Sequence, residues 1–102
     1  MSSRDPQIEF YGYFADPKER EKVGSLIETL ERIAPSDAHI KAIIGRANNL
    51  FEGIVSINSV TRKFSVYHRA DSEAGLIEYL QAEITRQIAD WKRTRFMSYQ
   101  VA

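Results

Sequence analysis

The feature that most constrains the fold is a repeated change of hydrophobic period along the chain. Apolar residues recur at every second position from about residue 8 to 14, and then at three- and four-residue steps over residues 17 to 34. The period of two returns in three stretches between residues 38 and 69, and the longer spacing returns from about residue 72 to 94. Alternation is typical of half-buried strands, and the longer spacing is typical of amphipathic helices. The sequence therefore predicts the order β-α-β-β-β-α.

Capping signals predict where the first helix begins and ends. Asp16 precedes Pro17, and Glu19 follows Asp16 by three residues, which is the pattern of a capping box with proline at the first helical position. Pro35 predicts that this helix ends near residue 34. Gly24 lowers helix stability by about 1 kcal/mol relative to alanine, and we interpret it as a point of close approach to the sheet.

The last helix has the clearest apolar stripe. Asp71 or Ser72 is expected to cap it, and we expect the helix to run from about residue 72 to 94. Residues 96 to 102 carry no strong signal and are expected to fray. The stripe is formed by Leu76, Ile77, Leu80, Ile84, Ile88 and Trp91.

Turn signals separate the strands, and alternation assigns their faces. Asn48-Asn49 predicts one turn because asparagine tolerates positive φ, and residues 59 to 62 form the next turn region. The inner phase contains Phe10, Phe14, Phe64 and Val66, whereas the outer phase contains Tyr11, Tyr13 and Tyr67. Tyrosines on an open sheet face could stack on bases, pack against one another across strands, or line a dimer interface.

The element order predicts an α+β fold. Three consecutive strands with short links favour an antiparallel meander, and the first helix connects two parallel strands through a right-handed crossover. The simplest packing is a four-stranded mixed sheet with two helices packed on one face, which leaves the other face for water or a partner. With 102 residues, the chain is expected to form a single domain, residues 1–102, with an ordered core over about residues 8–95.

The composition excludes several classes of protein and of functional site. The chain contains no cysteine, which excludes disulfides, thiolate metal sites and cysteine nucleophiles. No apolar run approaches the roughly 20 residues of a membrane span, and residues 1 to 7 are polar, without a signal-peptide core. We therefore expect a cytoplasmic protein without a membrane partner.

Residues that could support catalysis or bind a metal are sparse. His39 and His68 lie in separate strands without metal-ligand spacing, and the five glycines form no phosphate-binding cluster. Asp71 and Glu73 are best explained as acids in the first turn of a helix. The sequence predicts no enzyme, no metal site and no cofactor.

The distribution of charge is uneven although the net charge is zero. Residues 1 to 37 carry five basic and eight acidic residues, whereas residues 38 to 70 carry five basic residues and one acidic residue. A further basic cluster lies in the second half of the last helix. Such cations suit phosphate contacts, but solvated strand faces and interactions with the helix dipole explain them equally well.

Several strings, in order, resemble the family of ribosome hibernation-promoting factors, also called ribosome-associated inhibitor A or sigma-54 modulation proteins. The stretch 8 to 12, Ile-Glu-Phe-Tyr-Gly, is similar to the first strand of that family, and Asp16-Pro17 is similar to the entry of its first helix. The best match is residues 84 to 88, Ile-Thr-Arg-Gln-Ile, followed by the basic pair Lys92-Arg93. Glu83 and Asp90 depart from the family's lysine-rich last helix.

This resemblance implies the short form of the family, with a fold similar to that of double-stranded-RNA-binding domains. It implies a protein that binds ribosomal RNA of the small ribosomal subunit in the channel for messenger and transfer RNA, and thereby blocks translation in idle ribosomes under stress. An alternative hypothesis is that the protein is a divergent protein-interaction module of the same fold, which forms a homodimer through the open sheet face and does not bind the ribosome. Carried over by position, the RNA-binding residues are Arg86, Lys92 and Arg93, with Lys41, Lys63 and Arg69 added from the strands.

Overall fold

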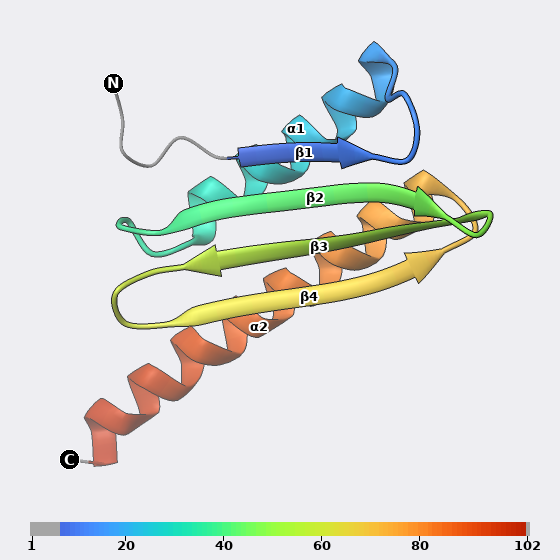
Figure 1. Ribbon diagram of the computed structural model, residues 1–102. Coiled ribbons are helices and arrows are strands. Elements are labelled where there is room, and N and C mark those ends of the chain that lie inside the picture. Colours follow the sequence, from blue (N-terminus) through green and yellow to red (C-terminus); the bar gives the residue numbers. More distant parts are fainter. Residues whose placement is uncertain (1–6, 102) are drawn as a thin grey trace.

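The computed structural model describes residues 7 to 101, with side chains from 7 to 94. Residues 1 to 6, which make up most of the polar N-terminal stretch, lie outside the described part, as does residue 102. The elements follow the predicted order (Figure 1). They are β1 (Gln7–Tyr11), α1 (Pro17–Ile33), β2 (His39–Ala47), β3 (Leu50–Asn58), β4 (Lys63–Ala70) and α2 (Glu73–Val101).

The sheet is four-stranded and mixed, in the order β1-β2-β3-β4. β1 pairs with β2 in parallel, and the other two pairs are antiparallel. Both helices lie on the same side of the sheet, as Figure 1 shows, and they contact each other. The predicted α+β architecture is confirmed.

The core lies between this side of the sheet and the two helices. Alternate strand residues point into it, together with the apolar stripes of both helices. Burying these side chains supplies the main stabilisation of the fold. The largest fully buried residues are Leu26, Leu30, Ile44, Ile57, Leu76, Leu80, Ile84 and Ile88.

The predicted caps and turns are confirmed. The Asp16 side chain accepts a hydrogen bond from the Glu19 backbone N–H at 2.8 Å, and the Glu19 side chain accepts one from the Asp16 N–H at 2.8 Å. At the start of α2 it is Ser72 whose hydroxyl accepts from the Gly75 N–H, at 3.0 Å. Asn48 and Asn49 both have positive φ, 54° and 64°, between β2 and β3.

The prediction for the end of the first strand is wrong. The strand stops at Tyr11 because Gly12 turns the chain with φ of 77° against the Arg46 carbonyl, where any side chain would collide. Beyond this turn the alternation no longer applies. Tyr13 therefore packs on the helical side, where its hydroxyl donates to Glu73 Oε2 at 2.6 Å, and Phe14 is 94% exposed rather than buried.

Two predictions about the helices are also wrong. Apart from its chain neighbours and the adjacent backbone of α1, no atom lies within 4 Å of the position that a Gly24 side chain would occupy, so Gly24 does not mark a close approach to the sheet. The α2 backbone continues to Val101, seven residues past the predicted end, since no proline or glycine interrupts the sequence after Gly75. Most of the stretch expected to fray is therefore helical.

Candidate nucleic-acid interface

The six predicted RNA-binding residues do not form one patch. Lys41, Lys63 and Arg69 alternate with buried strand residues and therefore lie on the open face of the sheet. Arg86, Lys92 and Arg93 are exposed on α2, which covers the opposite face. The structure thus divides the predicted site into two cationic groups, one on each side of the sheet.

On α2, two of the three cations are paired with acids of the same helix. Arg86 forms ion pairs with Glu83 and with Asp90, the latter at 2.9 Å, and Arg93 pairs with Asp90 at 2.8 Å. The hydrogen bond from Arg86 lowers the pKa of Glu83, and the same bond raises the pKa of Arg86. These contacts are exposed i,i+3 and i,i+4 pairs, which salt screens readily.

On the open sheet face, two of the three cations are also paired. Lys41 Nζ lies 3.4 Å from a Glu9 carboxylate oxygen, and Arg69 Nε lies 3.7 Å from Glu52 Oε1. Within residues 7 to 94, no carboxylate lies at ion-pair distance from Lys63 or from Lys92. These two lysines are the candidate cations that can reach a phosphate without first leaving an internal partner.

The Glu52 carboxylate on the open face also binds two tyrosine hydroxyls. It accepts hydrogen bonds from the hydroxyls of Tyr11 and Tyr67, the latter at 3.3 Å. The Tyr11 ring lies directly over Gly45, where a side chain would overlap it. The hydrogen bond to Glu52, followed by desolvation, raises the pKa of Tyr11 to about 12. Two of the three predicted open-face tyrosines are therefore confirmed there, bound to an acidic group.

Three arginines outside the predicted site lie over aromatic rings. The guanidinium carbon of Arg20 is 5.1 Å from the Phe10 centroid, and that of Arg46 is 5.3 Å from Phe51. Arg62 lies 5.9 Å from the Phe64 centroid, and the Phe64 ring also packs edge-on against Trp91 at a centroid distance of 5.7 Å. Of these three contacts, the sequence indicates only the one between Arg62 and Phe64, because residues two positions apart on an extended chain point to the same side. The contacts of Arg20 and Arg46 depend on the tertiary fold.

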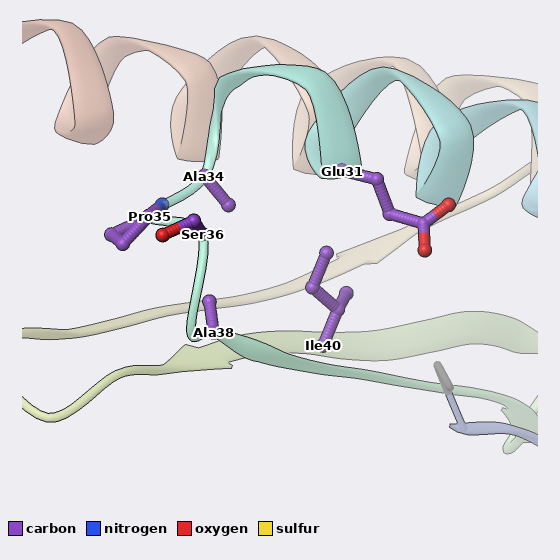
Figure 2. Close-up of a pocket in the computed structure, with 6 residues that line it drawn as sticks. All are labelled: Glu31, Ala34, Pro35, Ser36, Ala38 and Ile40. Atoms are coloured by element: carbon purple, nitrogen blue, oxygen red, sulfur yellow. The ribbon is translucent and has the colours of Figure 1, made fainter. Parts of the chain in front are cut away.

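The pocket drawn in Figure 2 is small. It lies between the end of α1 and the start of β2 and has a volume of about 120 Å³. Glu31 is the sole ionisable side chain among the lining residues, so they offer no acid-base pair. The other lining residues are Ala34, Pro35, Ser36, Ala38 and Ile40.

Two further classes of site have no support among residues 7 to 101. No group of three or more histidine, aspartate or glutamate side chains there is placed to hold a metal ion. Neither α1 nor α2, over the described residues, contains an apolar stretch that could span a bilayer.

Comparisons with known proteins place the fold. No protein family and no curated protein matches the sequence. The fold is nevertheless shared with solved structures, among them the following two. A ribosomal subunit interface protein from Coxiella burnetii aligns with a TM-score of 0.66 and 16% identity, over 85% of this chain and 98% of its own. The N-terminal domain of protein Y from Thermus thermophilus aligns with a TM-score of 0.72 and 10% identity, over 83% of this chain and 94% of its own.

Proposed function

We propose that the protein is a non-catalytic, cytoplasmic ribosome-binding factor that lies in the messenger and transfer RNA channel of the small subunit and keeps idle ribosomes inactive. The observation that carries this proposal is the fold shared with a ribosomal subunit interface protein over 85% of the chain. The channel and the stress-related role come from the resemblance in sequence. Binding by occlusion needs no catalytic group.

The shape and the placement of charge support this proposal. The Cα atoms span 50 × 33 × 17 Å, so the molecule is a thin plate. Lys63 lies on one broad face, and Lys92 lies on the helix that covers the other. A plate with cations on both faces suits a channel with RNA walls, because each face can neutralise phosphates and release counterions.

The ion pairs rank the six candidate cations. Among the side chains of residues 7 to 94, no carboxylate pairs with Lys63 or Lys92, whereas Arg86 must first separate from Glu83 and Asp90. Separation from two carboxylates offsets part of the gain from phosphate binding. We therefore expect Lys63 and Lys92 to contribute most to affinity, and Lys41, Arg69, Arg86 and Arg93 to contribute less.

Co-sedimentation with purified small subunits and whole ribosomes across a salt series tests this proposal. We expect affinity to fall as salt rises, with a log-log slope of about 0.9 for each phosphate neutralised. Lys63→Gln with Lys92→Gln should reduce that slope by roughly two. The matched control is Arg86→Gln, on the same helix as Lys92, which should change the slope less. Absence of binding at low salt by the folded wild-type protein would refute the proposal.

A second candidate function is a protein-interaction module that forms a homodimer through the open sheet face. The register favours it, because Ile43, Ile54 and Tyr67 form one row across three strands on this face. The Glu52 carboxylate beside this row would repel phosphate. Sedimentation equilibrium distinguishes the two functions: a dimer that Ile54→Lys dissociates, together with no ribosome binding, would favour the second.

A further inference from the structure

One aromatic ring projects into water from a loop whose neighbouring residues are packed. Phe14 is 94% exposed, in the connection between β1 and α1. Its neighbour Ala15 is 3% exposed, and Tyr13 packs against the core. Because residues 13 and 15 both turn inward, the backbone directs the Phe14 ring outward.

The loop that presents Phe14 is fixed on both sides. On one side, the Tyr13 ring packs against Phe10 at 6.1 Å and Phe51 at 5.3 Å, and its hydroxyl donates to Glu73. On the other side, Asp16 caps α1. A residue held in place before binding costs little conformational entropy when it binds, so Phe14 is suited to act as an anchor.

Two guanidinium groups lie at the same end of the molecule. Arg20 Nε donates to the carbonyl of Ala15 at 3.1 Å, directly beside Phe14. Arg46 lies over Phe51, the ring that contacts Tyr13. Neither arginine forms an ion pair with a carboxylate in the described part of the chain.

Three carboxylates around this end are engaged within the fold, whereas Asp71, directly after β4, is exposed. Asp16 and Glu19 bond to each other's backbone in the capping box. Glu73 is 7% exposed and accepts the Tyr13 hydroxyl. Phe14, Arg20 and Arg46 present one aromatic face and two cations, which complement a base with its phosphates better than an apolar protein pocket.

We propose that Phe14 stacks on an unpaired RNA base while Arg20 and Arg46 contact the adjoining phosphates. This inference rests on the proposed ribosome binding and adds a contact point at the end of the molecule where β1 meets α1. Unpaired bases are the parts of a folded RNA that aromatic side chains can reach.

Binding of Phe14 variants to small ribosomal subunits and to fluorescein-labelled twelve-residue oligoadenylate tests the inference. Phe14→Ala and Phe14→Leu should each weaken binding of both ligands by roughly 5- to 150-fold, the range found for base stacking. Phe14→Tyr should bind both ligands like wild type, since tyrosine keeps the aromatic ring face. Val60→Ala is the matched control, because Val60 is 92% exposed in the turn between β3 and β4 and has no ring. It should bind like wild type.

The outcomes separate this inference from the proposed function. If wild type binds subunits and Phe14→Ala binds equally well, the stacking contact is refuted and the function survives. If the variants lose subunit binding but bind oligoadenylate like wild type, Phe14 contacts a ribosomal protein and the inference is refuted. If wild type binds neither ligand, both proposals fail.

Discussion

Gly24→Ala should stabilise the protein, although glycine at this position first indicated close packing. The residue lies in the interior of α1, where alanine is favoured by about 0.8–1.0 kcal/mol. No other part of the protein comes within 4 Å of the added carbon beyond its chain neighbours and the adjacent backbone of α1, so no tertiary clash reduces this gain. For a domain of this size, the gain corresponds to a rise in Tm of roughly 4 to 8 °C.

Gly53→Ala is the matched comparison and should have the opposite effect. Its added carbon would lie 2.9 Å from Ile44 Cδ1 and 3.2 Å from both Leu76 Cδ2 and the Ile43 carbonyl oxygen. Overpacking of this kind costs about 1–3 kcal/mol. The same chemical change therefore has opposite signs at two positions, because one glycine faces open space and the other faces the packed core.

Urea unfolding followed by circular dichroism at 222 nm measures both effects. With a slope of about 1–3 kcal/mol per molar urea, the midpoint of Gly24→Ala should rise by roughly 0.3 to 1 M, with the slope unchanged. A midpoint equal to or below that of wild type would refute the reasoning for Gly24. A Gly53→Ala protein as stable as wild type would refute the packing argument.

Two further predictions concern pH. Burial raises the pKa of Glu73, so the native state holds its proton more tightly and loses stability as pH rises above the usual value of 4.5. Glutamine does not titrate, so Glu73→Gln should not lose this stability. In urea unfolding between pH 4 and 7, the free energy of unfolding of Glu73→Gln minus that of wild type should therefore increase with pH, and a constant difference would contradict this. Tyr11, with a pKa raised to about 12, stabilises the native state below its usual pKa of 10.0, and this stability is lost as pH rises from 10 towards 12. In absorbance titration, Glu52→Gln should lower this pKa; an unchanged curve would contradict the role of Glu52.

Most of the fold could be predicted from the sequence because its signals are local. The capping box at Asp16, the turn at Asn48-Asn49 and the two periods each depend on residues a few positions apart. The predictions fail where a segment distant in the sequence determines the local backbone conformation. Tyr13 and Phe14 were assigned by alternation, but Gly12 turns the chain against the carbonyl of Arg46, which is 34 positions away in the sequence.

The candidate site could be predicted less well. The pairing of Arg86 with Glu83 and Asp90 follows from helical spacing and was visible in the sequence as two acids among the basic residues. The pairing of Lys41 with Glu9 required the parallel register of β1 and β2, and the cluster around Glu52 required three strands side by side. The spacing of residues within one strand does not predict contacts between side chains on different strands.

The sequence by itself determined the order of the elements, their caps and the identity of the cations, because periodicity and capping act over one or two turns. Tertiary structure alone decided that the cations divide between two faces, that no carboxylate of the described side chains pairs with Lys63, and that Phe14 projects into water. The physical reason is that exposure and ion pairing depend on distances across the fold. Strand register and the turn at Gly12 set these distances after the local elements have formed.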